Sequence, residues 1–420
     1  MPTIVTSEIL IKAQPSQIYY AFTHASALHE WLCDFATVAP RPGGRMYLWW
    51  HGDFYSAGEY INLEENKSIK FKWFARFEPS SSEVTVHLTP HADGTLVTLN
   101  HQVPDGDAWN KRAQGFKAEW DSTLPNLASV IETGLDKRTF DRPMLGINLS
   151  DFTAEIALKL GVPVLQGSRL DEVSLGMGAF AAGLCKNDVI GEMNGKPITN
   201  DFGSFISALE GKKGGDRVEV VFYRGPEKKI VSMELTKRPI PDMSWDPGEL
   251  AGMVRNKYED TLGRLEACFE KVSEPDADLQ PAPGEWSAKQ TLAHLIQTER
   301  IWIANLDDSV GGYERLSDDW GGNLLSHINA TVTAFGTYPK MLEELRCLSV
   351  EMVAFLGSLP MTFVERKASY VQNALQVLEM ESHTSSHIDQ INTALKAAKK
   401  HNDHNIPPIS GESWPAFAAG

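Results

Sequence analysis

The sequence predicts a multidomain protein with three segments of different fold class, because the hydrophobic periodicity changes twice along its 420 residues. Residues 1–138 combine alternating, strand-like runs with helices, which predicts an α+β domain. Residues 141–240 are rich in short strands and turn residues, which predicts a β-rich domain. Residues 246–400 follow the three- and four-residue steps of long amphipathic helices, which predicts an all-α four-helix bundle. We expect an irregular tail at 401–420.

Composition and charge exclude several classes of protein. The formal net charge of −16 argues against a general affinity for nucleic acid or an anionic membrane, because both attract clustered Lys and Arg. No run approaches the ~18 consecutive apolar residues of a membrane-spanning helix, and the first residues do not resemble a secretory signal. The few cysteines form no C-x-x-C pair, which predicts free thiols in a reducing compartment. We therefore expect a cytoplasmic protein.

The first segment reads as an antiparallel sheet between short and long helices. A strand at Ile4–Lys12 is followed by a short helix that begins at Pro15, and an amphipathic helix over about Lys111–Thr133 closes the segment. Strand-like runs separated by turn signals lie between these helices, at Arg45–Trp50, Phe54–Asn62, Ser68–Arg76, Val84–Pro90 and Thr95–Val103. This order predicts a helix-grip layout.

The same segment resembles the SRPBCC (START-like) superfamily, in the branch related to the activator of Hsp90 ATPase. The residues that carry the resemblance are Pro15-x-x-Ile18-x-x-Ala21-Phe22, Leu28-x-x-Trp31, Gly43-Gly44-Arg45, Gly58-x-Tyr60 and Gly115-Phe116…Trp120…Leu124. The resemblance implies an apolar ligand cavity, which we expect to be lined by Trp31, Trp49, Trp50, Trp73, Phe74 and Trp120. The alternative is that these aromatic residues only fill a core. We expect three histidines at strand ends to be solvated, namely His87, His91 and His101.

The second segment resembles a PDZ domain of the bacterial type. The residues that carry the resemblance are Ala182-Gly183-Leu184, Asp188-Val189-Ile190 and Asn194-Gly195, which encode a helix end, a buried strand and a tight turn. The resemblance implies that the loop of Leu145, Gly146 and Ile147 binds the C-terminus of a peptide, which would then add to the sheet as a strand. The alternative is a spacer or internal docking module.

The third segment contains four predicted long helices, at about Pro247–Val272, Ser287–Leu306, Leu325–Leu356 and Ala368–Lys399. The second begins with a capping-box pattern, Ser287-Ala288-Lys289-Gln290. The third contains Gly336 and Pro339, which predict a kink or a break. On the fourth helix, His383 and His387 share the inward apolar stripe one turn apart, a spacing at which two imidazoles can bind one metal ion.

This segment resembles the DinB/YfiT-like family of metal-binding four-helix bundles. The residues that carry the resemblance are Glu285-Trp286-Ser287, Leu292-x-His294-Leu295, Glu299 and His383-x-x-x-His387-Ile388-Asp389-Gln390-Ile391. The resemblance implies a divalent metal, zinc or nickel, on His294, His383 and His387, with one coordination position open. It also implies transfer of a small thiol in some members, and a homodimer. Three carboxylates could orient the imidazoles: Glu299, Glu381 and Asp389. We expect His327, His401 and His404 to be surface residues.

These patterns support a leading hypothesis and two alternatives. The leading hypothesis is a metal-dependent transferase, possibly thiol-linked, or a hydrolase acting on a small apolar substrate, and it names no catalytic residue beyond the three ligands. The first alternative is a non-enzymatic binding or adaptor protein of the stress response, which three modules with ligand or peptide sites would fit. The second is a co-chaperone, which rests on the Hsp90-activator resemblance alone.

Overall fold

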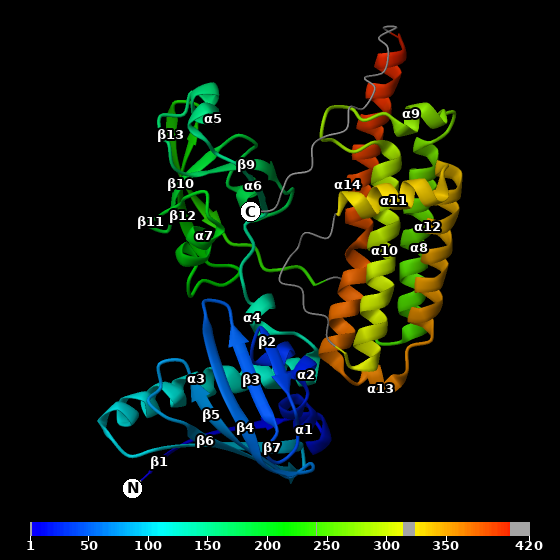
Figure 1. Ribbon diagram of the computed structural model, residues 1–420. Coiled ribbons are helices and arrows are strands. Elements are labelled where there is room, and N and C mark those ends of the chain that lie inside the picture. The colour runs from blue at the N-terminus through cyan, green and yellow to red at the C-terminus, as the bar shows by residue number, and fades with distance from the viewer. Residues whose placement is uncertain (1, 241, 314–323, 404–420) are drawn as a thin grey trace. The chain divides into compact units, whose positions relative to one another are not determined.

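The computed structural model describes residues 2–240, 242–313 and 324–403, and the side chains as far as residue 400 (Figure 1). The chain divides into two compact units, one of residues 1–240 with 366–368 and one of the remaining residues, whose described part is mainly helical. The helix expected to end near Lys399 continues through Asp403, so the predicted irregular tail was wrong for residues 401–403. The rest of that tail, including His404, lies outside the described residues.

The first domain is a seven-stranded antiparallel sheet with helices, as the sequence predicted. The strand order is β1-β7-β6-β5-β4-β3-β2, and neighbouring strands are antiparallel throughout. Its strands are β1 (Thr3–Ile11), β2 (Phe35–Val38), β3 (Arg45–Trp50), β4 (Phe54–Glu64), β5 (Ser68–Ala75), β6 (Ser82–His91) and β7 (Gly94–Val103). Its helices are α1 (Pro15–Thr23), α2 (Ala25–Trp31), α3 (Asp107–Thr133) and α4 (Lys137–Phe140). Figure 1 shows the long helix α3 lying across the sheet.

The expected cavity residues divide between the two faces of this sheet. Trp31, Trp73 and Trp120 are at most 5% exposed and belong to the core, where the rings of Trp73 and Trp120 lie 5.8 Å apart. Trp49 is half-buried and alternates with the buried Leu48, so it lies on the opposite face and does not line a cavity beside α3. The placement favours core packing. The buried Nε1–H of Trp73 has no hydrogen-bond partner among the described residues, and a bound ligand could supply one. Ligand binding in this domain therefore stays a prediction.

His101 is buried, and the expectation that it is solvated was wrong, whereas His87 and His91 are exposed as predicted. In β7 the buried positions alternate with partly exposed ones, and His101 has the parity of the buried Leu99 and Val103. The indole N–H of Trp120 donates to Nδ1 of His101 over 3.1 Å. Nε2 therefore carries the proton and donates to Oγ of Ser82 over 2.7 Å. Burial lowers the pKa of His101 to about 3, which keeps the ring neutral.

The second domain is a smaller antiparallel sheet of order β13-β12-β10-β9-β8, with β11 paired to β10. Its strands are β8 (Ile147–Ser150), β9 (Ser168–Val173), β10 (Val189–Met193), β11 (Lys196–Pro197), β12 (Arg217–Arg224) and β13 (Glu227–Glu234). Its helices are α5 (Ala154–Leu160), α6 (Gly178–Ala181) and α7 (Phe202–Ala208). Asn194 and Gly195 join β10 to β11 with positive φ at both residues, which is the tight turn predicted from the sequence.

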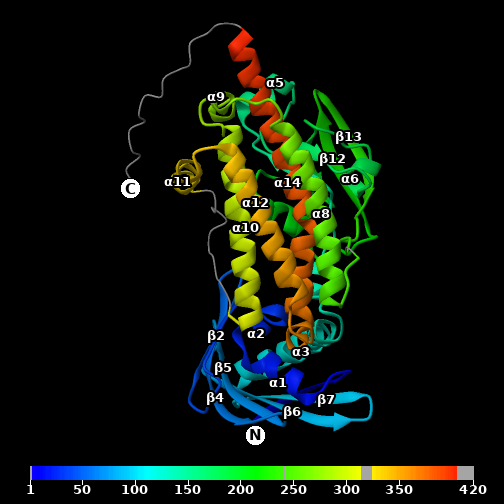
Figure 2. The same cartoon turned by 90° about the vertical axis from the view of Figure 1, so that its right-hand side faces the viewer.

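The helical unit is the predicted four-helix bundle, and its long helices run side by side in both views (Figures 1 and 2). The long helices are α8 (Pro247–Cys268), α10 (Ala288–Gly311), α12 (Tyr338–Gly357) and α14 (Lys367–Asp403). Shorter helices are α9 (Glu274–Asp278), α11 (Leu325–Phe335) and α13 (Met361–Val364). The predicted third helix is broken between α11 and α12, where Gly336 has a φ of +72°. Proline in the first turn of α12 then starts the next helix.

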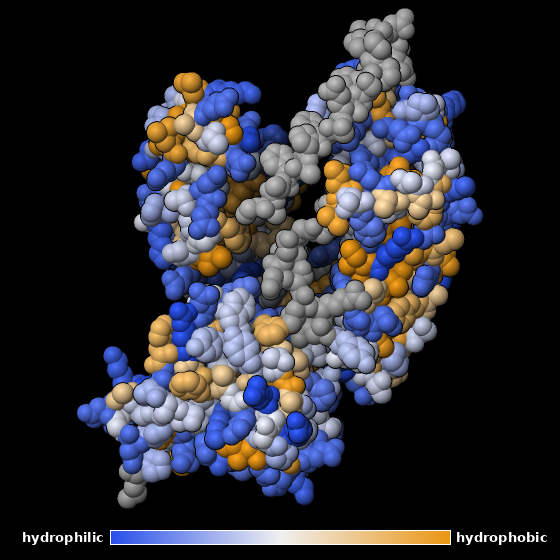
Figure 3. All heavy atoms as spheres, viewed as in Figure 1, coloured by the Kyte–Doolittle hydropathy of each residue, from blue (hydrophilic) through white to orange (hydrophobic). Residues whose placement is uncertain are grey.

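The surface of the helical unit mixes hydrophilic residues with apolar ones near α10, α11 and α12 (Figure 3). Exposed apolar side chains on these helices include Ile301, Leu325 and Val350. Among the described residues, no helix is long and apolar enough to cross a membrane.

Candidate metal centre

The helix α10 positions the first of the three predicted ligands. It begins with the capping box expected from the sequence, because the backbone N–H of Gln290 donates to Oγ of Ser287 and Oε1 of Gln290 accepts from the backbone N–H of Ser287. His294 lies two turns from this start and is 8% exposed, in a stretch of α10 from Thr291 to Gln297 in which every residue is buried. The fixed start of α10 therefore sets where its imidazole enters the bundle.

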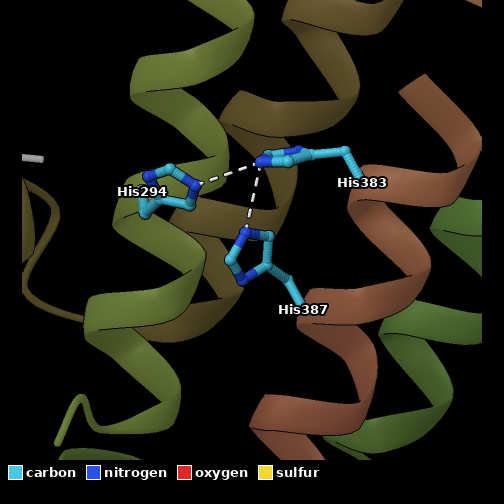
Figure 4. Close-up of side chains that lie close together, drawn as sticks. All are labelled: His294, His383 and His387. Carbon is cyan, nitrogen blue, oxygen red and sulfur yellow. Dashed lines mark hydrogen bonds between the residues drawn. The ribbon is translucent and has the colours of Figure 1, made fainter. Parts of the chain in front are cut away.

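His383 and His387 lie one turn apart on α14 and face His294 (Figure 4). Nε2 of His383 lies 3.3 Å from Nε2 of His294 and 3.2 Å from Nε2 of His387. Zinc–nitrogen bonds of about 2.0–2.1 Å in a tetrahedral site place two ligand nitrogens about 3.3–3.4 Å apart. The three ligand atoms lie within 4.8 Å of one another. The spacing of these three nitrogens therefore fits one metal ion with a fourth position for another ligand.

The three imidazoles are chemically suited to binding a cation. Burial, and secondly the neighbouring His387, lower the pKa of His383 to about 4. Burial also lowers the pKa of His387. Each neutral ring presents either an N–H or a lone pair at Nε2, so at least two of the three nitrogens present the same kind of group to one another. A cation placed between three lone pairs would satisfy all three nitrogens at once.

The other ring nitrogens of the α14 histidines differ in their surroundings. Nδ1 of His387 lies 2.8 Å from Oε1 of Gln390, so this ring donates from Nδ1 and keeps the lone pair of Nε2 for a metal. Nδ1 of His383 is buried and has no hydrogen-bond partner among the described residues. Aromatic rings enclose the site, with Trp286 5.3 Å from the ring of His294 and Trp302 5.6 Å from that of His383.

The structure separates the three carboxylates that were expected to orient the imidazoles. Glu299 is 3% exposed and lines a small cavity together with His383. Glu381 is partly exposed and forms an ion pair with Lys257, and Asp389 is exposed. Only Glu299 is thus placed beside a ligand. His327 is exposed as predicted, and the side chain of His401 lies outside the described residues.

Sequence reasoning missed Tyr258 and the role of Gln390. Tyr258 on α8 donates a hydrogen bond from its hydroxyl to Oε1 of Glu299. The sequence signal for Tyr258 was its position on the buried face of a helix, because Val254, Tyr258 and Leu262 follow four-residue steps. Gln390 follows His387 by three residues, which is the helical spacing at which the two side chains meet.

The predicted peptide-binding loop of the second domain leads into β8, an edge strand whose first residue is Ile147. Gly146 is buried with a φ of +74°, and a Cβ added there would lie 2.3 Å from Cβ of Met177. Leu145 and Ile147 on either side are half-buried. The backbone of the loop is fixed by hydrogen bonds from the N–H of Ala179 to Leu145 and from the N–H of Ser174 to Gly146. Only glycine suits this backbone position.

Comparison with protein families gives three matches in the order that the sequence predicted. Residues 12–132 match the activator of Hsp90 ATPase homolog 1-like family, residues 143–235 match the PDZ domain, and residues 257–391 match the DinB superfamily. The expected three-domain architecture is therefore confirmed.

Curated relatives cover a smaller part of the chain. A probable periplasmic serine endoprotease DegP-like from Rhizobium meliloti is 27% identical over 112 residues, which are 26% of this chain and 22% of that protein. The periplasmic pH-dependent serine endoprotease DegQ of Escherichia coli is 30% identical over 111 residues, 26% of this chain and 24% of that protein. The chain thus spans about a quarter of the length of these relatives.

Solved structures match over about a third of the chain. The Mesorhizobium loti protein MLL2253 is 24% identical with a TM-score of 0.29, over 31% of this chain and 97% of that one. The Aha1 dimer from Colwellia psychrerythraea is 20% identical with a TM-score of 0.27, over 30% of this chain and 95% of that one.

Proposed function

We propose that the helical domain holds a divalent metal ion, zinc or nickel, on Nε2 of His294, His383 and His387. We propose further that the protein uses this ion for a metal-dependent transfer, thiol-linked, or a hydrolysis, on a small apolar substrate. The observation that carries the proposal is the convergence of three imidazole nitrogens at the 3.2 and 3.3 Å separations that a tetrahedral site requires. The match of residues 257–391 to the DinB superfamily supports it.

The residues around the site support chemistry on a small molecule. A divalent metal bound by three neutral imidazoles would act as a Lewis acid that lowers the pKa of a bound water or thiol. Gln390 fixes the ring of His387 through Nδ1, so its lone pair is already directed at the site. Trp286 and Trp302 contact the imidazoles and supply apolar surface against which a small apolar ligand can pack.

A cobalt-substituted protein tests the thiol part of this proposal. We expect Co²⁺-loaded protein to develop a thiolate-to-cobalt charge-transfer absorption when it is titrated with 2-mercaptoethanol, because one coordination position is open. The His387→Ala variant should lose the band, and His327→Ala, which changes an exposed histidine outside the site, should keep it. A wild-type protein that binds Co²⁺ and shows no such band would restrict the proposal to hydrolysis.

A peptide-binding adaptor is the second candidate function, and β8 is the observation that favours it. This edge strand directly follows Gly146, whose φ is positive, and an edge strand can pair with a peptide as an added strand. The co-chaperone hypothesis rests on the match of residues 12–132 alone, and we rank it third. A cytoplasmic location and a homodimer stay proposals. The four cysteines, which all lie among the described residues, form no disulfide.

A further inference from the structure

We propose that Glu299 is a positioning residue for the metal ligand His383, acting through one buried water, and that Tyr258 holds Glu299 in place. This inference rests on the metal site proposed above. It adds two residues, from α8 and α10, to the ligands on α10 and α14.

The first step concerns the ring of His383. When Nε2 of a neutral imidazole binds a metal, Nδ1 carries the proton and needs an acceptor. Nδ1 of His383 is buried and has no acceptor among the described residues, in contrast to Nδ1 of His387, which donates to Gln390. A buried N–H without a partner costs about 1–3 kcal/mol, so a native structure normally supplies one.

The second step concerns what lies beside His383. A cavity of about 10 Å³ is lined by His383 and Glu299, with hydroxyl-bearing side chains around it. Those hydroxyl groups belong to Tyr258, Thr261, Thr298, Ser349 and Thr384. A volume of this size holds about one water molecule, and a buried water needs between two and four polar partners. The cavity meets both conditions, and a water in it can accept from Nδ1–H of His383 and donate to the carboxylate of Glu299.

The third step concerns the carboxylate itself. Glu299 is 3% exposed, and in the described part of the chain it forms no ion pair; its hydrogen-bond partner is the hydroxyl of Tyr258. A buried carboxylate without a cation is costly, and burial raises the pKa of Glu299 to about 7. A divalent ion on three neutral imidazoles supplies the missing positive charge nearby. A metal at the three histidines would therefore offset part of the cost of burying this carboxylate.

The role of Tyr258 follows from the hydrogen bond that its hydroxyl donates to Glu299. Its hydroxyl is buried and donates to Oε1 of Glu299, which fixes the carboxylate against α8. Tyr258 lies on α8 and Glu299 on α10, so their hydrogen bond joins these two helices beside the cavity that Glu299 shares with His383. Removing the hydroxyl leaves the carboxylate free to rotate away from the cavity.

Zinc affinity measured with a competing chelator on the full chain tests the inference. We expect Glu299→Gln to weaken zinc binding by about 10- to 100-fold, the usual effect of losing the carboxylate partner of a metal-bound imidazole. Tyr258→Phe should weaken it by less than Glu299→Gln does, because the carboxylate remains. The matched control is Glu381→Gln, two residues from His383 on α14 and paired with Lys257, which should bind zinc as the wild type does.

A second readout separates positioning from a structural role. Without metal, Glu299→Gln should melt at the same temperature as the wild type or higher, since a neutral amide replaces a buried carboxylate. With Co²⁺ bound, its ligand-field absorption should differ from that of the wild type, because the ring of His383 is less firmly held. If both Glu299→Gln and Tyr258→Phe bind zinc as tightly as the wild type and keep its cobalt spectrum, this inference is overturned while the proposed metal site stands. A wild-type chain that binds no zinc would overturn the proposed function together with it.

Discussion

Buried histidines in this chain differ in the partners of their ring nitrogens, and burial alone does not distinguish them. His101 and His294 are both buried, at 0% and 8% exposure. Both ring nitrogens of His101 are hydrogen-bonded to protein groups, so the ring is complete without a ligand. In His383, by contrast, Nε2 faces two other imidazoles and Nδ1 has no partner in the described part of the chain. The hydrogen bonds of both nitrogens therefore distinguish a core histidine, His101, from a proposed metal ligand, His383.

The core role of His101 predicts an unusual pH dependence. Its folded pKa of about 3 lies below the ordinary value of 6.5, so only the unfolded chain binds a proton between these values. The stability that depends on neutral His101 is present above pH 6.5 and is lost as the pH falls toward 3, at no more than about 1.4 kcal/mol per pH unit.

Histidine-selective NMR of the full chain checks this prediction. The His101 resonances, assigned by their loss in His101→Gln, should remain those of a neutral ring down to the acid unfolding of the first domain. A ring that titrates near pH 6.5 in the folded protein would show that the hydrogen bonds to Ser82 and Trp120 do not form.

At the level of elements, local signals at helix ends and the alternation of buried residues in strands both carried structural information. The break between α11 and α12 followed from Gly336 and Pro339, and the start of α10 followed from its capping box. The alternation of buried residues along β7 also predicts that His101 is buried. Its position near a strand end led to the wrong expectation that it is solvated. The pair of Tyr258 and Glu299 could not be predicted, because it joins two helices across 41 residues and depends on their relative rotation.

The edge strand β8 gives a prediction about peptide binding at the second domain. We expect a display library of peptides with free C-termini to yield ligands of the full chain, and Gly146→Ala to weaken their binding at least about tenfold. The added Cβ would collide with Met177 and move the loop, and φ is positive there.

The matched control for this variant is Gly161→Ala. Gly161 has a similar φ of +69° in the same domain, but a Cβ there meets nothing within 4 Å, and the residue lies outside the loop. Its binding should remain that of the wild type. Equal losses in the two variants would indicate general destabilisation and would remove the argument for a peptide site.

For the whole molecule, the sequence predicted the number, order and class of the domains, because each has its own hydrophobic periodicity and its own core. It predicted two of the three converging histidines from spacing on one helix, and the third from a family resemblance. What it could not supply is the distance between α10 and α14, which places Nε2 of His294 3.3 Å from that of His383. That distance depends on the packing of the complete bundle.

The metal content of the purified full chain tests the central claim most directly. After loading with Zn²⁺ and removal of free ions, elemental analysis should find one zinc ion per chain in the wild type and in His327→Ala. His294→Ala, His383→Ala and His387→Ala should each lose most of it, because two remaining imidazoles bind zinc weakly. Negligible zinc in the wild type, or equal zinc in the wild type and all three ligand variants, would contradict a metal centre at these histidines.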